Sequence, residues 1–468
     1  MEPTDLAFAG VGRQAELVRS GEVSSRELVE LYLGRIDRLQ PQLNCFSKVM
    51  GERALAEGQQ ADARRGAHAE RPLLGVPVAV KDVHDVAGEV TTMGTAAHDG
   101  RPAARDSEIV RRIRSAGAVI IGKTTTPELA IMGDTEGLAF GVTRNPWDLD
   151  RSAGGSSGGS GAAVAAGLCA AATASDGAGS IRYPAANCGL FGLKPQRDRV
   201  SLAPWREHWH GLSVNGFEAR SVRDTALLLD LAAEHPPERP FAEAAASPPG
   251  NLRVAVSVKP PPFLLPPPPL TRVHPELSGA VEDTAGLLRS LGHAVEQRDP
   301  DYGFASADVV TRYLRGIADD ARAMARPERL QRRTRGIARL GRIYNDRLLG
   351  MALAREAGHA ERLGRLFRDH DVLLTPMTAR PPVRAGQWEG LPGLPTVLGM
   401  TRVYPFAVIW NMTGQPAAAV PAGLSSDGLP IAVQLVGRPG DEATLLSLAA
   451  QIEAERRWLD RRPPLSYV

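Results

Sequence analysis

The sequence predicts an α/β fold in which a mixed central β-sheet is sandwiched between helices. Short apolar, β-branched runs alternate with longer stretches of helical periodicity along the 468-residue chain. This alternation is typical of layered α/β proteins. With 43% hydrophobic and 23% charged residues, the chain can also bury a large core.

The first helices are expected within residues 1–60. Ser24 and Glu27 have the spacing of a capping box, which predicts a helix start. Apolar residues then recur at helical intervals: Leu28, Tyr32, Ile36 and Leu39. Strands are expected at residues 76–80, 119–121, 254–258, 372–375 and 431–436. Segments 232–251 and 259–269 are rich in proline or in Pro, Ala and Glu, which predicts loops.

Composition excludes several classes of protein. A net charge of +2 gives no reason to expect a polyanionic partner, and no apolar run has the length of a membrane span. The N-terminal residues lack the basic and apolar regions of a signal peptide. The three cysteines, Cys45, Cys169 and Cys188, cannot all pair and lack metal-ligand spacing. We therefore expect a cytoplasmic protein without a metal, with Cys188 packed in the core.

Two glycine-rich loops that carry serines follow an isolated lysine. The loops are residues 154–160 (GGSSGGS) and 175–182 (SDGAGSIR), and Lys81 ends the apolar run 75–80. Only five of the 55 basic residues are lysines. In a chain this rich in arginine, a lysine is expected chiefly where arginine cannot replace it.

These residue types suit nucleophilic catalysis. A serine hydroxyl needs a base to take its proton as it attacks a carbonyl. Arginine stays protonated, whereas a desolvated lysine can be neutral and accept that proton. Glycine loops also allow backbone N–H groups to approach a developing oxyanion.

Each feature alone has a simpler interpretation. A Gly/Ser-rich stretch is usually a flexible linker, and a lysine at a strand end is usually solvated. Residues 161–168, however, are small and apolar and suit a tightly packed buried helix. A linker does not usually open a core helix, so the combination favours a catalytic site.

Together these segments resemble the amidase signature family of serine hydrolases, which uses a Ser-cisSer-Lys triad. The resemblance extends through residues 183–195, 74–82, 122–124 and 428–437. It implies that Lys81 is the base, Ser156 the relay serine after a cis peptide, and Ser180 the nucleophile, 24 residues after Ser156. The backbone of Gly177, Ala178, Gly179 and Ser180 would form the oxyanion hole. The supporting residues would be Ser157, Ser175, Asp176 and Arg182.

The resemblance also implies a single amidase domain over residues 1–468. Its signature core would cover about 70–230 and 400–460, with N-terminal helices at 1–60 and a more variable pocket region at about 235–400. Aromatic residues are only 5% of the chain but gather in regions expected near the acyl site. The candidate pocket residues are Trp205, Trp209, Tyr404, Trp410 and Asn411.

The chain departs from the family pattern twice. Residues 177–179 read Gly-Ala-Gly where Thr-Gly-Gly is usual, and Ala178 is tolerated only if that position is not left-handed. Losing an oxyanion donor typically costs about 2.7–4 kcal/mol, so turnover depends on this position. The second departure is Gly216-Phe217-Glu218 where Gly-Pro is common, and it bears on loop shape.

Three other patterns are interpreted differently. Residues 117–124 match the phosphate-loop expression, but the β-branched residues of a strand lie inside the motif and Pro127 follows, so we expect a sheet strand. The arginine-rich stretch 322–347 could hold an anionic substrate or tRNA, but a solvated helix face is expected because acidic residues balance the chain. His208 is an alternative general base.

The leading hypothesis is an amidase that forms an acyl-enzyme on Ser180 and also cleaves esters. It would need no cofactor, act on a small-molecule amide, bind neither nucleic acid nor membrane, and form a homodimer. Two alternatives remain open at this stage: a glutaminase-type subunit of a tRNA-dependent amidotransferase, and a non-catalytic binding protein on a hydrolase fold.

Overall fold

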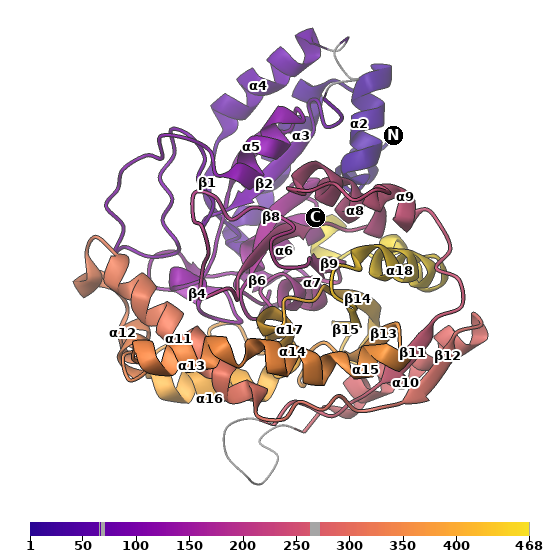
Figure 1. Cartoon of the computed structure of the whole chain (residues 1–468). Coiled ribbons are helices and arrows are strands. Elements are labelled where there is room, and N and C mark those ends of the chain that lie inside the picture. The colour runs from indigo at the N-terminus through magenta and orange to yellow at the C-terminus, as the bar shows by residue number, and fades with distance from the viewer. Residues whose placement is uncertain (65, 67–70, 263–271, 468) are drawn as a thin grey trace.

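The computed structural model describes residues 1–64, 66, 71–262 and 272–467 (Figure 1). Its strands form two large sheets and two short two-stranded ribbons. The ribbons pair β4 (Glu136–Gly137) with β5 (Gly141–Val142) and β6 (Arg144–Asn145) with β7 (Asp148–Ser152). Part of the proline-rich segment 259–269, from residue 263 onward, lies outside the described residues.

The first sheet carries Lys81 at the end of one of its central strands. Its strand order is β1-β3-β2-β8-β10, in which β2 runs parallel to β3 and β8 while the outer strands are antiparallel. Both β2 and β3 are buried along their whole length, which explains their continuous apolar runs. The strands are β1 (Phe46–Val49), β2 (Pro77–Lys81), β3 (Val119–Thr124), β8 (Ala171–Asp176) and β10 (Val214–Glu218).

The second sheet is also mixed, with strand order β12-β11-β13-β15-β14-β9. Strand β11 is parallel to both of its neighbours, and the other pairs are antiparallel. The strands are β9 (Gly192–Lys194), β11 (Arg253–Val256), β12 (Ala294–Gln297), β13 (Val372–Pro376), β14 (Ala417–Leu424) and β15 (Pro430–Gly437).

The two sheets meet where β9 and β10 lie together. A single antiparallel bridge joins Phe191 to Ala219 there. Gly216 of β10 lies so close to β9 that an added Cβ would be 3.3 Å from the Leu193 carbonyl oxygen and 2.8 Å from Ile181. The mixed α/β architecture is therefore confirmed, and its sheet consists of two parts joined at this crowded contact.

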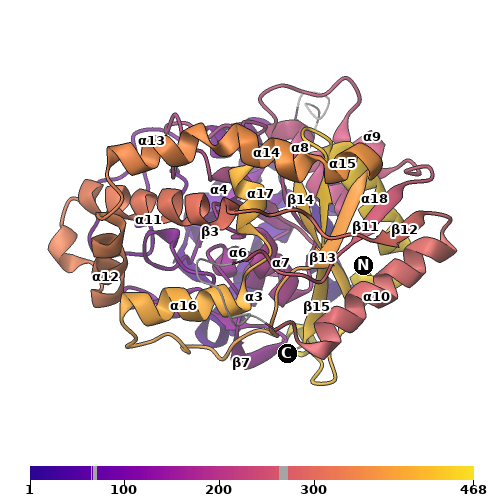
Figure 2. The ribbon, with the colours of Figure 1, turned by 60° about the horizontal axis from the view of Figure 1, so that its bottom comes forward.

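Helices surround both sheets (Figures 1 and 2). The first of the long ones, α3, begins with the capping box formed by Ser24 and Glu27, as expected. The helices are α1 (Pro3–Ala7), α2 (Gly10–Ser20), α3 (Ser25–Leu43), α4 (Gly51–Ala63), α5 (Glu108–Ser115), α6 (Gly158–Ala165), α7 (Arg182–Cys188), α8 (Val222–Ala232), α9 (Phe241–Ala245), α10 (Pro275–Ser290), α11 (Ala305–Ala323), α12 (Arg332–Gly341), α13 (Asp346–Ala354), α14 (Glu356–Gly364), α15 (Leu366–Asp369), α16 (Gly393–Val403), α17 (Val408–Met412) and α18 (Glu442–Arg456). Short 3₁₀ turns are η2 (Glu128–Ala130), η3 (Pro327–Arg329), η4 (Trp458–Asp460) and η5 (Pro464–Tyr467).

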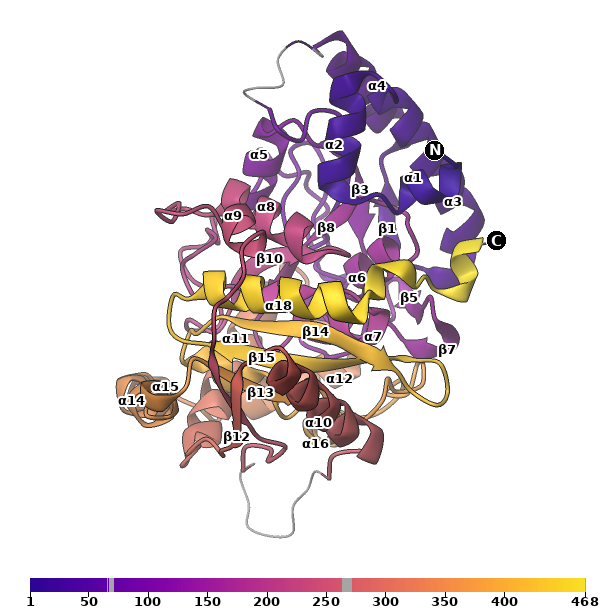
Figure 3. The same cartoon turned by 90° about the vertical axis from the view of Figure 1, so that its right-hand side faces the viewer.

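The helices divide into layers. Figure 3 shows α18 along one face of β14 and β15 and α10 on the other side of that sheet. Helices α11 to α16 lie together beside the sheets (Figure 2). The two ends of the chain lie close together, as the 2.8 Å ion pair between Arg462 and Asp5 shows. Within the described ranges, every helix is too short or too polar to cross a lipid bilayer.

Most expected elements are found, with shifted ends. The five expected strands correspond to β2, β3, β11, β13 and β15, although β11 ends at Val256 and not at residue 258. The segment 232–251 is not all loop, since it contains α9, whose first N–H groups donate to Asp230 and whose Phe241 is buried.

The phosphate-loop-like segment and the arginine-rich stretch, which could have indicated ligand binding, have other roles in the structure. In the phosphate-loop-like segment, Lys123 ends up inside the protein, where its Nζ lies 2.7 Å from the Asp82 carboxylate and donates to Thr91. The arginine-rich stretch is mostly exposed, as expected. Arg333 is the exception, because it is buried and paired with Glu136 at 2.6 Å.

Candidate active site

Lys81 lies at the end of β2, inside the protein. Its side chain has no exposed surface, and its Nζ donates to Ser156 Oγ at 2.8 Å and to Ser175 Oγ at 2.9 Å. Its backbone N–H donates to Thr173 Oγ1 at 2.9 Å, which ties the end of β2 to β8. The strand pairing therefore delivers the amine to the two serine loops.

The charge of Lys81 is set mainly by burial. Burial lowers the pKa of its ammonium group from the ordinary 10.5 to about 7, although the carboxyls of Asp176 and Glu218 oppose this shift. A large fraction of the amines is then neutral near pH 7. A neutral amine can accept a proton, which is the property that the proposed base requires.

Ser156 is placed by a tightly packed loop before α6. The peptide bond between Gly155 and Ser156 is cis. A Cβ on Gly155 would lie 2.6 Å from the backbone of Asp134, so only glycine fits there. Helix α6 is wholly buried, and it packs against β2, β3 and β8, directly behind the lysine.

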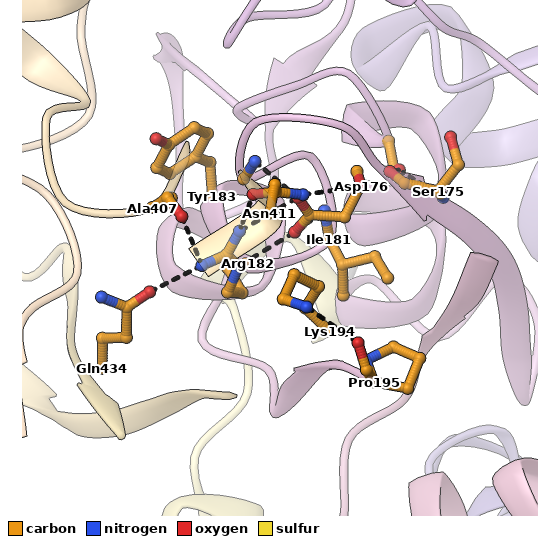
Figure 4. Close-up of polar contacts among 12 residues, drawn as sticks. Ser175, Asp176, Ile181, Arg182, Tyr183, Lys194, Pro195, Ala407, Asn411 and Gln434 are labelled. Carbon is orange, nitrogen blue, oxygen red and sulfur yellow. Dashed lines mark hydrogen bonds and ion pairs between the residues drawn. The ribbon is translucent and has the colours of Figure 1, made fainter. Parts of the chain in front are cut away.

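Ser180 lies in the connection from β8 to α7. It is 7% exposed, and its carbonyl accepts a hydrogen bond from Ser157 N–H at 3.3 Å. The connection is closed by a fully buried ion pair in which Arg182 Nε lies 2.9 Å from Asp176 Oδ2 (Figure 4). Burial raises the pKa of the Asp176 carboxyl, but the Arg182 cation together with hydrogen bonds from Arg182 and Asn411 outweighs this, and the net pKa lies below its ordinary value.

The backbone donors of this loop are not all equivalent. Gly179 N–H already donates to Asp176 Oδ1 at 2.6 Å, which differs from the expectation that it faces the oxyanion. Ala178 does not have a positive φ, so its methyl group causes no left-handed strain. Gly179 has φ +120°, and a Cβ there would lie 2.3 Å from the Tyr183 ring.

Two cavities flank these residues. The first, which we call the catalytic cleft, is lined by Ser156, Ser175, Gly177 and Ser180 together with Trp205, His208 and Trp209. The second, the apolar pocket, has a volume of about 90 Å³ and begins at Ala178 and Tyr183. Helices α11, α16 and α17 supply most of its other walls, and Tyr404 completes it.

The expected pocket residues thus have different positions. Trp205 and Trp209 line the catalytic cleft, and Tyr404 lines the apolar pocket. Trp410 and Asn411 are fully buried behind these cavities. Trp410 packs against Phe367 and Tyr302, while the Asn411 amide donates to Asp176 and accepts from Arg182 (Figure 4).

Two polar clusters near the site were not singled out from the sequence. The buried Asp134 carboxylate accepts from Tyr404 Oη at 2.9 Å and from Trp388 Nε1 at 2.7 Å. His84 hydrogen bonds Thr173 and Asn215, each at 2.9 Å, and burial lowers its pKa to about 3. For His84, its position just beyond a buried strand was a local sequence signal that could have indicated a site residue. The Asp134 cluster gave no such signal, because it joins segments more than 250 residues apart.

Among the residues that the structure describes, the side-chain partners of His208 are residues other than Ser156, Ser175 and Ser180. Its Nδ1 lies 2.8 Å from Ser213 Oγ, and its Nε2 lies 3.1 Å from Asp320 Oδ2. The three cysteines are buried and free. In the described part of the chain, no group of three or more His, Cys, Asp or Glu side chains is placed to hold a metal ion.

Comparison with known proteins identifies the family. The family model described as Amidase matches residues 27–446. The chain belongs to the amidase family. AmiB2 of Mycobacterium tuberculosis, named as an amidase, is 53% identical over 468 residues and is covered completely by the alignment, as is this chain.

The family assignment extends to solved structures. A 6-aminohexanoate cyclic dimer hydrolase, solved with substrate, superposes with a TM-score of 0.90 at 34% identity over 98% of this chain and 99% of that one. A glutamyl-tRNA(Gln) amidotransferase component from Thermotoga maritima superposes with a TM-score of 0.74 at 27% identity, over 92% of this chain and 91% of that one. This member of the amidase family is therefore an amidohydrolase with the amidase-signature fold.

Proposed function

We propose that the protein hydrolyses carboxylic amides through an acyl-enzyme on Ser180, with Ser156 as proton relay and neutral Lys81 as base. The observation that carries this proposal is the 2.8 Å contact between the fully buried Lys81 Nζ and Ser156 Oγ. An amine with a pKa of about 7 in that position can draw a proton through Ser156.

The reaction follows from this arrangement. Lys81 accepts the Ser156 proton while Ser156 accepts the proton of Ser180, whose Oγ attacks the amide carbonyl. The tetrahedral intermediate expels the amine, which takes a proton from Ser156 as Lys81 returns its own. Water then attacks the acyl ester through the same relay and releases the acid. Esters should also be cleaved, because an alkoxide leaves without prior protonation more readily than an amine.

The apolar pocket favours an uncharged acyl group. Among the described residues that line it, none carries a charged side chain, and Val309, Leu314 and Met400 are typical of its walls. The ammonium and carboxylate groups of glutamine would lose their hydration there without a partner. This argues for a free-standing amidase over the glutaminase-type interpretation.

The test compares Ser180→Ala and Lys81→Met with wild type on an aliphatic amide and on the ester of the same acid. Both variants should lose at least about 10³-fold in kcat, as removal of a nucleophile or its base does in serine hydrolases. Lys259→Met is the matched control, because that lysine is largely exposed and should leave turnover unchanged.

Three outcomes separate the alternatives. Acylation of wild type but not of Ser180→Ala, detected by mass spectrometry, supports the proposed nucleophile. Hydrolysis of glutamine only with added partner proteins would favour the amidotransferase interpretation. Failure of the wild type to react with amides, esters or a serine-directed probe would indicate a binding protein.

A further inference from the structure

The wall of the catalytic cleft holds an unusual concentration of strained backbone. Eight non-glycine residues in the described chain have a positive φ. Met93, Ala130 and Trp209 are among them and line the cleft, and Leu129 and His210 are their direct neighbours. Left-handed non-glycine residues cost of order 1–3 kcal/mol each and gather at functional sites. The strained backbone of the cleft wall therefore indicates a functional surface.

Trp205 presents a flat face on this wall, because its ring stacks on His208, which in turn stacks on Trp209. The ring centroids of Trp205 and His208 are 4.7 Å apart with an interplanar angle of 14°, so the rings are stacked. Trp205 is 38% exposed, which is unusual for a tryptophan, while Trp209 behind His208 is 6% exposed. Apolar side chains, including Val83 and Met93, line the same cleft.

The stack is fixed from behind by α11. Asp320 accepts from His208 Nε2 and also from Trp209 Nε1 at 2.7 Å. Since Nε2 carries the proton donated to Asp320, Nδ1 accepts the hydroxyl proton of Ser213. Arg312 of the same helix donates to the His210 carbonyl at 2.9 Å. His208 and Trp209 are thus held in place before any ligand binds, and Trp205 stacks on this fixed support, which lowers the entropy cost of binding.

The chemistry decides which half of the substrate meets this stack. The leaving nitrogen must receive a proton from Ser156, so it must lie on the Ser156 side of Ser180. Ser156 lines the catalytic cleft with Trp205 and His208, whereas Ala178 and Tyr183 open into the apolar pocket. The acyl group then enters the apolar pocket and the amine enters the catalytic cleft.

We propose that Trp205, backed by His208, stacks on the leaving group and makes the enzyme selective for planar aromatic amines, so that N-aryl amides are its preferred substrates. This inference rests on the proposed function. An aryl ring stacks on a preformed aromatic face with the geometry that aromatic pairs favour, and a saturated ring of the same size cannot do so.

The experiment compares two amides of hexanoic acid, the anilide and the cyclohexylamide, in wild type and variants. The readout is the ratio of their kcat/KM values, and the change in this ratio between enzymes cancels the intrinsic reactivity of the two leaving groups. Trp205→Leu should lower the ratio between about twofold and tenfold, the range expected for one aromatic stacking contact. Trp205→Phe should retain most of it.

Two further variants separate positioning from folding. Asp320→Ala should also lower the ratio, because His208 and Trp209 lose their shared acceptor, while hydrolysis of the cyclohexylamide persists. Phe304→Leu is the matched control, since Phe304 is 89% exposed and should leave the ratio unchanged.

The outcomes are distinguishable. An unchanged ratio in Trp205→Leu, with the cyclohexylamide still hydrolysed, would overturn the inference and leave the proposed function intact. Loss of both activities in wild type, including activity on the ethyl ester of the same acid, would overturn the proposed function itself.

Discussion

A single buried amine decides what the individual catalytic residues can do. Lys81 is surrounded by the hydroxyls of Ser156 and Ser175, and its Nζ contacts no carboxylate directly in the described structure. The nearby acids, Asp176 and Glu218, raise its pKa only partly against the effect of burial. This environment suits the base that we propose rather than half of an ion pair.

The pH dependence of activity should follow from this residue. With a Lys81 pKa of about 7, kcat/KM should rise about tenfold per pH unit well below pH 7 and level off above about pH 8, because only the neutral amine accepts a proton. Rates from pH 5 to 9 on an uncharged amide would measure this. A flat profile between pH 5 and 7 would contradict a lysine base.

Substitution of Gly179 tests the role of the loop that precedes Ser180. Gly179→Ala should reduce kcat at least about 10²-fold, the size typical when oxyanion donors are lost, because its φ is +120° and the new methyl group would meet the Tyr183 ring at 2.3 Å, which displaces Ser180 and the neighbouring backbone donors. Gly88→Ala is the matched control, since Gly88 also has a positive φ but nothing lies within 4 Å of an added Cβ. Equal effects of the two substitutions would show that backbone strain alone is responsible.

At the scale of secondary-structure elements, the connection from β8 to α7 ties the two sheets together. Arg182 pairs with Asp176 at the end of β8, and it also donates to Gln434 of β15 at 2.7 Å and to the Ala407 carbonyl just before α17 (Figure 4). The loop that carries Ser180 is therefore braced by strands and helices from both halves of the chain.

Removing this brace should be costly. Arg182→Leu should lower the free energy of unfolding by about 3–5 kcal/mol, because it leaves the Asp176 carboxylate buried without its cation. Arg13→Leu, which removes an exposed pair with Glu16, should cost less than about 1 kcal/mol. Urea unfolding of both variants measures the difference, and similar values for the two would contradict the brace.

Local sequence signals were sufficient to predict individual helices and strands, but they did not predict which distant residues these elements contact. The capping box at Ser24 and the β-branched run at 119–121 each carry their structure in a few adjacent residues. The contacts of Arg182 with Gln434 and Asn411 span more than 220 residues, and no periodicity indicates them. The same limit hid Asp134, whose partners Trp388 and Tyr404 come from distant parts of the chain.

For the whole molecule, the position of the site follows from the two sheets and the helices beside them. Lys81 and the β8 loop come from the first sheet, while α11 supplies walls to the apolar pocket and Asp320 behind the catalytic cleft. The glycine loops predicted the chemistry because their motif is local and specific. Trp205 and Trp209 of the cleft and Tyr404 of the apolar pocket were also predicted, but the other walls of that pocket were not, because they depend on how α11 and α16 pack against the sheets.

Because the molecule buries many ionisable groups, its free energy of unfolding should depend on pH. In the unfolded chain Lys81 titrates near its ordinary pKa of 10.5, whereas in the folded protein its pKa is about 7. Between these values the unfolded state binds the additional proton, so this residue makes the folded state more stable as the pH rises. Lys194, whose pKa burial also lowers, has the same sign, whereas buried Glu218, whose pKa burial raises, has the opposite sign because its folded state binds the additional proton.

The contribution of Lys81 can be isolated by comparing wild type with Lys81→Met, which cannot titrate. From pH 7.5 to 9, the free energy of unfolding of wild type should rise relative to that of Lys81→Met by up to about 1.4 kcal/mol per pH unit, the limit for one proton. Lys259→Met should run parallel to wild type, since Lys259 is largely exposed. Parallel curves for wild type and Lys81→Met would mean that the buried amine keeps its proton in the folded enzyme, and the lysine could then not act as the base.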